Sequence, residues 1–199
     1  MTTDQLTDPR ADLDLAVDQV LRLVAAVRPA DLDRPTPCEE FDVRHLLGHL
    51  LGVLGRIAHV GGGGHPFDVP TTVLDVEDDA WAARCEGAAA GMRAVWADDA
   101  VLDAVLHLPF GDVPGRGAAM AYTEELTAHA WDLASALGRR DVLDPVLGEV
   151  ALAAATRFIP DADRGRIPFG PVVAVPAGAG PYERLAGWLG RDPSWTPAP

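Results

Sequence analysis

Two side chains that can share a metal ion lie four residues apart in the second half of the sequence. Glu125 and His129 fall within the segment TEELTAHAWD, residues 123–132. Side chains four apart on an α-helix point within about 40° of each other, and their Cβ atoms lie roughly 5–6 Å apart. A carboxylate and an imidazole at that separation can bind one divalent cation.

A third ligand is needed for a credible metal site, and His49 is the best candidate. It is a lone imidazole within the apolar segment LLGHL, residues 46–50. Two His and one carboxylate leave an open coordination position on zinc, as in catalytic zinc sites. Zinc, nickel, iron and cobalt all suit this donor set. The same residues fit a second interpretation, in which Glu125 and His129 form a surface ion pair and His49 is a hydrogen-bonded core residue.

Asp132 and His45 are further candidates beside these ligands. Asp132 lies three residues after His129 on the same side of the helix, where it either orients a ligand imidazole or is an exposed side chain. His45 and His49 form a competing pair at helical spacing, in which His45 would replace one of the three ligands. Its position one turn into a helix, after the polar Asp42, makes it the weaker candidate.

Two other motifs are better explained as structural features than as catalytic or binding sites. The glycines at 61–64 lack the Lys and Ser/Thr of a phosphate-binding loop, so we expect a flexible connection. Cys38 stands in a Pro-rich turn, where the neighbouring carboxylates of Glu39 and Glu40 oppose formation of a reactive thiolate. Cys38 and Cys85 are too few for a disulfide framework and are expected to be free thiols of a reducing cytosol.

The charge balance narrows the choice of partners. The 199 residues include 30 acidic and 16 basic side chains, all of the latter Arg, for a net charge of −14. Such a chain repels phosphate backbones and anionic lipids, so we expect neither nucleic acid nor membranes as partners. The sequence contains neither a secretory signal pattern nor an apolar run long enough to cross a membrane. We therefore expect a soluble cytoplasmic protein that acts on a small molecule as a monomer or homodimer.

Apolar residues at helical spacing predict the elements that position these side chains. The main helices are expected at about 9–28, 42–61, 77–96 and 117–137, with a fifth at 145–158. The run 105–110 fits a short strand or an ordered loop, 172–175 a short strand, and 181–189 a last helical segment. This pattern predicts a mainly all-α protein, an antiparallel bundle over 1–160 that holds the metal site. A short, mostly irregular Pro/Gly-rich tail over 161–199, ending in a short helix, would pack on the bundle.

Three segments resemble a known family. They are residues 36–50, which include TPC, FDVR and LLGHL, residues 125–134, ELTAHAWDLA, and residues 185–193, which end in GRDP. Together they resemble an actinobacterial group of small proteins related to the mycothiol-dependent maleylpyruvate isomerases and the wider DinB-like metalloproteins. The resemblance implies a DinB-like four-helix bundle, and a divalent metal, often zinc, held by His49, Glu125 and His129. It also implies possible use of mycothiol as a cosubstrate.

The chain departs from that family in two respects. The isomerases are longer and carry a separate C-terminal domain, so neither substrate nor reaction can be carried over from them. Phe41 stands where the family motif has Trp, which is a mild change.

The function expected from these observations is a metal-dependent thiol S-transferase or isomerase acting on a small electrophilic substrate. A metal-bound thiol loses its proton and becomes a nucleophile at neutral pH. The alternative is a non-catalytic protein that binds a metal or small molecule, as in sequestration or resistance. A bundle without any metal is the third option.

Overall fold

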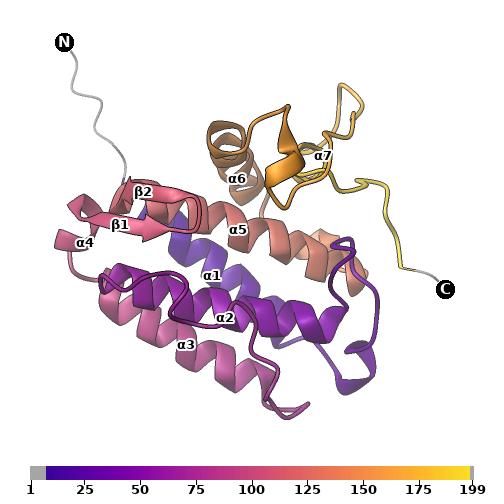
Figure 1. The fold of residues 1–199 in the computed structure, drawn as a ribbon. Helices are drawn as coiled ribbons and strands as arrows, with labels where there is room; N and C mark the ends of the chain where they lie inside the picture. The colour runs from indigo at the N-terminus through magenta and orange to yellow at the C-terminus, as the bar shows by residue number, and fades with distance from the viewer. Residues whose placement is uncertain (1–7, 198–199) are drawn as a thin grey trace.

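The computed structural model describes residues 8–197, and four helices form its main bundle (Figure 1). Helix α1 packs against α3 and α5, and α2 packs against the same two helices. The side chains between them form one apolar core, and the predicted all-α fold is confirmed. Helices α2 and α3 run parallel, since Arg44 at the start of α2 pairs with Asp78 before α3 and Gly61 at its end meets Trp96 at the end of α3, so the prediction of an antiparallel bundle is wrong for this pair. The bundle helices are α1 (Arg10–Val24), α2 (Val43–Gly61), α3 (Trp81–Trp96) and α5 (Gly115–Ala136).

Helix α2 begins and ends where its sequence predicts. The side chain of Asp42 accepts a hydrogen bond from the backbone N–H of His45 at 2.8 Å, which caps the first turn. The helix ends at Gly61, where a Cβ would lie 2.6 Å from the indole nitrogen of Trp96. Glycine at this position therefore allows α2 and α3 to approach closely.

Helix α5 is buried on two sides, which explains its small and apolar composition. One side faces the main core, and the other carries Ala128 and Trp131 into a second apolar cluster with α6 (Pro145–Phe158) and α7 (Pro181–Trp188). Figure 1 shows α6 and α7 on one side of α5 and α2 and α3 on the other. Gly138 follows the helix with φ of +68°, a conformation that glycine adopts without steric cost, and confirms the predicted stop.

A β-hairpin lies between α3 and α5, after the short helix α4 (Ala100–Asp103). Strands β1 (Val105–Leu108) and β2 (Gly111–Pro114) pair in antiparallel register, with Val105 opposite Pro114. The first strand agrees with the apolar run in the sequence. The second was not predicted, because Gly-Asp-Val-Pro lacks the alternation of a half-buried strand.

The C-terminal segment is mostly irregular, as predicted, apart from α7. The buried Arg164 holds part of it in place by donating to the carbonyls of Pro160, Gly170 and Trp188. The prediction of a short strand at 172–175 is wrong. Instead of pairing with another strand, this segment lies against α7, where the N–H of Val173 donates to the carbonyl of Gly187.

The division into domains at residue 160 stays a prediction. The two ends of the chain, residues 1–7 and 198–199, lie outside the part that the structure describes. Among the described residues, no helix is both long and apolar enough to cross a lipid bilayer.

Candidate functional site

The three residues predicted as ligands come together between α2 and α5. The Nε2 atom of His49 lies 3.5 Å from Oε1 of Glu125, and the rings of His49 and His129 meet edge to face at 4.7 Å between centroids. Phe41 stacks on His49 at 5.2 Å and lies 6.3 Å from His129, forming an apolar wall. The arrangement brings two imidazoles and one carboxylate into a common space.

A hydrogen-bond acceptor faces Nδ1 of each imidazole. In His49 this nitrogen lies 3.2 Å from the carbonyl oxygen of Thr71, and in His129 it lies 3.0 Å from Oδ2 of Asp132. Because a carbonyl and an ionised carboxylate only accept, each Nδ1 carries the proton. The Nε2 of His129 then keeps its lone pair, the state in which imidazole binds a metal. The Nε2 of His49 faces Oε1 of Glu125 at 3.5 Å, so both nitrogens of this ring point at acceptors.

Two glycines of α2 allow the Thr71 carbonyl to reach His49. A Cβ on Gly48 would lie 2.7 Å from the carbonyl oxygen of Val73, and one on Gly52 would lie 2.5 Å from that of Thr71. The N–H of Val73 also donates to the carbonyl of Gly48 at 3.0 Å. The segment 70–74 is thus docked on α2.

Asp132 is fully buried, so the interpretation of it as an exposed side chain is wrong. Its two oxygens accept hydrogen bonds from Nε and Nη2 of Arg191, each at 2.8 Å, in addition to facing His129. Burial raises the pKa of Asp132, but the charge of Arg191 and the bond to His129 outweigh it, and the net pKa is lowered. Asp132 is therefore an anion that links the C-terminal segment to His129.

Glu125 is charged and surrounded by cationic or polar groups. Its carboxylate lies 3.5 Å from His49 and 3.9 Å from Nη1 of Arg56. Burial raises the pKa of Glu125, but His49 and Arg56 favour the anion, so the net pKa lies below its ordinary value. No ion pair joins Glu125 to His129 among the described residues, so the predicted surface pair at this spacing is not formed.

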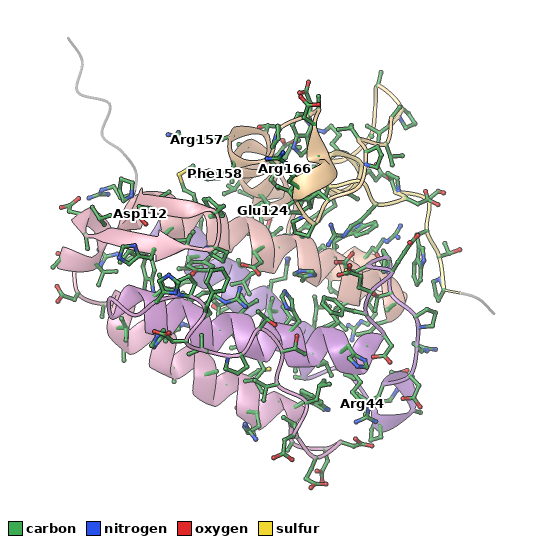
Figure 2. The ribbon with its side chains drawn as sticks, viewed as in Figure 1. Arg44, Asp112, Glu124, Arg157, Phe158 and Arg166 are labelled. Carbon is green, nitrogen blue, oxygen red and sulfur yellow. The ribbon has the colours of Figure 1, made fainter. Side chains whose placement is uncertain are left out.

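Glu124, the neighbour of Glu125, points elsewhere. Figure 2 shows it on the edge of α5 that is turned towards α6 and the C-terminal segment. Burial and the charge of Glu125 raise its pKa to about 8. The two adjacent carboxyls therefore differ in their preferred protonation state.

His45 is separate from this cluster. Its Nδ1 lies 2.8 Å from Asp42, and its side chain is 46% exposed. The structure thus places it at the surface of the first turn of α2, as a partner of the helix cap.

A second set of possible donors lies next to the first. Atoms of Cys38, His129 and Asp132 all fall within 4.8 Å of one another, the one such group found in the part of the chain that the structure describes. Both oxygens of Asp132 are already occupied by Arg191 and His129. Burial and then the charge of Asp132 raise the pKa of the Cys38 thiol to about 11. This set therefore has fewer free donor atoms than His49, Glu125 and His129.

The two cysteines give a direct test of the native packing. Burial raises the pKa of Cys38 to about 11 and that of Cys85 to about 12, so both are neutral thiols near neutral pH. We expect Ellman's reagent at about pH 7.5 to label the native protein roughly 100-fold more slowly than the chain in guanidinium chloride. The native rate should increase with pH. Equal rates in the two states would contradict this placement of the thiols.

The sequence did not reveal three residues near the site. Arg56 and Tyr122 are seven residues from His49 and His129 respectively, so helical spacing could have placed them on the same faces. Arg191 is 59 residues from its partner Asp132, and no local pattern connects the two.

The all-α bundle has the fold of the DinB-like class. The chain belongs to the mycothiol maleylpyruvate isomerase N-terminal domain family, whose sequence profile matches residues 13–134. This confirms the resemblance, and the matched region includes His49, Glu125 and His129.

Relatives and solved structures extend the comparison. Uncharacterized proteins from two strains of Mycobacterium tuberculosis are each 32% identical over 185 residues, which cover 92% of this chain and 98% of theirs. A crystal structure of the mycothiol-dependent maleylpyruvate isomerase superposes with a TM-score of 0.57 at 18% identity, and a histidine-to-alanine mutant of it with 0.62 at 17%. Each match covers 78% of this chain and 70% of the isomerase. At these identities the likeness shows a shared fold.

Proposed function

We propose that the protein is a metal-dependent enzyme that uses a low-molecular-weight thiol, such as mycothiol. The enzyme would either transfer this thiol to a small electrophile or use it to isomerise the electrophile. His49, Glu125 and His129 would hold the divalent ion, with zinc as the leading candidate. The observation that carries the proposal is the meeting of Nε2 of His49 with the carboxylate of Glu125 beside the ring of His129, while an acceptor faces Nδ1 of each imidazole. Membership of the family and the activity of the mycothiol-dependent maleylpyruvate isomerase, which shares the fold, also support it.

The separation of two of the three donor groups fits such an ion. Two ligand atoms bound to zinc at about 2.0–2.1 Å in a tetrahedral arrangement lie roughly 3.3 Å apart. His49 Nε2 and Glu125 Oε1 are 3.5 Å apart. The lowered pKa of Glu125 keeps the carboxylate deprotonated, and the lowered pKa of His129, caused first by burial, keeps that imidazole neutral. Each group is thus in the form that binds a metal.

When bound, the ion would favour the thiolate form of a thiol and polarise a carbonyl group of the substrate. The protein's own residues supply the rest. Thr71 and Asp132 keep the imidazoles in position, and Phe41 excludes water from one side of the two rings. The side chain of Glu125 is 27% exposed, which leaves an approach for small molecules.

The test begins with metal content. Tag-free protein should retain close to one equivalent of zinc after dialysis, and His49→Ala should retain less than about a tenth. His45→Ala is the matched control on the same helix, because His45 is exposed and bonded to Asp42, and it should bind zinc like the wild type. Equal zinc retention by all three proteins would refute the ligand set.

Activity is tested separately. The zinc protein is mixed with mycothiol and a panel of electrophiles that includes maleylpyruvate and monochlorobimane. We expect the wild-type protein to consume the thiol faster than His49→Ala does. Tight zinc binding with no thiol consumption across the panel would instead support a non-catalytic binding protein.

A further inference from the structure

The guanidinium of Arg56 is buried beside the site without the hydrogen bonds that such a group requires. The residue is 5% exposed, yet its Nε and Nη2 atoms have no hydrogen-bond partner among the described residues. The carboxylate of Glu125 lies 3.9 Å from Nη1, which is beyond hydrogen-bond distance. An unsatisfied buried cation costs several kcal/mol. By contrast, the similarly enclosed Arg191 is satisfied by both oxygens of Asp132.

A second unpartnered donor lies on the facing helix. Tyr122 is 2% exposed, and its buried hydroxyl has no hydrogen-bond partner in the described part of the chain. Burial and the charge of Glu125 raise the pKa of Tyr122, and the charge of Arg56 opposes this, so all three groups lie within electrostatic range. The phenol is therefore a neutral donor.

The antiparallel packing of α2 and α5 brings the two donors to the same level of the bundle. Arg56 follows His49 by seven residues, and Tyr122 precedes His129 by seven, about two helical turns in each case. Figure 1 shows α2 and α5 running in opposite directions. Because the rings of His49 and His129 meet across these helices, residues two turns further along each helix come to the same level of the bundle. Glu125 lies between the two levels, near both His49 and Arg56.

We infer that Arg56 and Tyr122 form a buried subsite for one small oxyanion, a carboxylate group, next to the proposed metal ligands. A guanidinium presents two parallel N–H donors that match a carboxylate, and a phenol can add a third. Glu125 does not fill this role, because its carboxylate is already near His49 and lies outside hydrogen-bond distance of Arg56. This inference deepens the proposed function, on which it rests for one point: the electrophile would carry a carboxylate.

The experiment uses metal-free protein and acetate as the probe. Binding is followed by saturation-transfer difference NMR, with chloride replaced so that ionic strength is constant. We expect saturable binding to the wild type, and binding weakened at least about tenfold in Arg56→Met. Tyr122→Phe should weaken it by about three- to tenfold, with an unchanged melting temperature, because the hydroxyl it removes has no protein partner.

Two controls separate this subsite from general charge and from the metal site. Arg93→Met removes an arginine paired with Asp14 and Asp18 at the surface, and should leave acetate affinity unchanged. His49→Ala should lose zinc but keep acetate binding in the metal-free protein. Zinc binding without acetate binding would reject the subsite and leave the proposed function standing. Acetate binding without zinc binding would reject the proposed function and leave the subsite standing.

The inference is overturned if the wild type shows no saturable binding of acetate. It is also overturned if Tyr122→Phe binds acetate as well as the wild type does. The second variant decides the matter even if Arg56→Met does not fold, since Tyr122→Phe keeps the volume and the ring of the original side chain.

Discussion

Replacing Asp132 by Asn should destabilise the protein by about 3–5 kcal/mol, because it leaves the buried Arg191 without a counter-charge. In the native protein both carboxylate oxygens accept hydrogen bonds from Arg191, and one also faces Nδ1 of His129. An amide turns one of these acceptors into a donor, so one donor would face another. Urea unfolding monitored by tryptophan fluorescence measures the loss.

The same change should weaken zinc binding by about 10- to 100-fold, because His129 loses the acceptor that fixes its tautomer. Competition with a chromogenic chelator measures this effect. Asp192→Asn is the control, since Asp192 is exposed, bonds to Ser194 and should change stability by no more than about 0.5 kcal/mol. Adding Arg191→Met to Asp132→Asn should recover part of the stability. If Asp132→Asn unfolds at the wild-type urea concentration, the ion pair does not stabilise the fold.

Replacing Gly52 by Ala should destabilise the protein by about 1–3 kcal/mol, although Ala is the better helix former by about 1 kcal/mol. The added Cβ would lie 2.5 Å from the carbonyl oxygen of Thr71, and 2.8 Å from its carbonyl carbon. The segment 70–74 must then move away from α2. Since the displaced carbonyl is also the acceptor for His49 Nδ1, we expect zinc affinity to fall by about tenfold.

Gly55→Ala is the matched control on the same helix. A Cβ at Gly55 meets nothing within 4 Å, so helix propensity alone should act and stability should rise by up to about 1 kcal/mol. Zinc affinity should be unchanged. If Gly52→Ala and Gly55→Ala had the same stability and the same zinc affinity, the docking of segment 70–74 would not need the glycine at 52.

Much of the bundle could be predicted from the sequence, because helix signals are local. The cap at Asp42, the end of α2 at Gly61 and the stop at Gly138 depend on residues within one or two turns. The strand expected at 172–175 failed for the opposite reason. Four apolar residues form a strand only if a second strand is available to pair with them, and that depends on the tertiary fold.

Local spacing is enough to put Glu125, His129 and Asp132 on one side of a helix. The helical repeat places residues three and four apart on one face, whatever lies across from them. It also placed His49 on an apolar helix, where an imidazole needs a polar partner.

The partners of these side chains, in contrast, depend on how distant segments of the chain pack together. Thr71 reaches His49 through a close approach at Gly52, and Arg191 reaches Asp132 from 59 residues away. Arg56, in contrast, is left with donors that no described residue satisfies. The physical reason is that hydrogen bonds form over about 3 Å in space without regard to separation along the chain. Which buried polar atoms are paired, and which remain free for a metal or a substrate, is therefore settled when the helices pack.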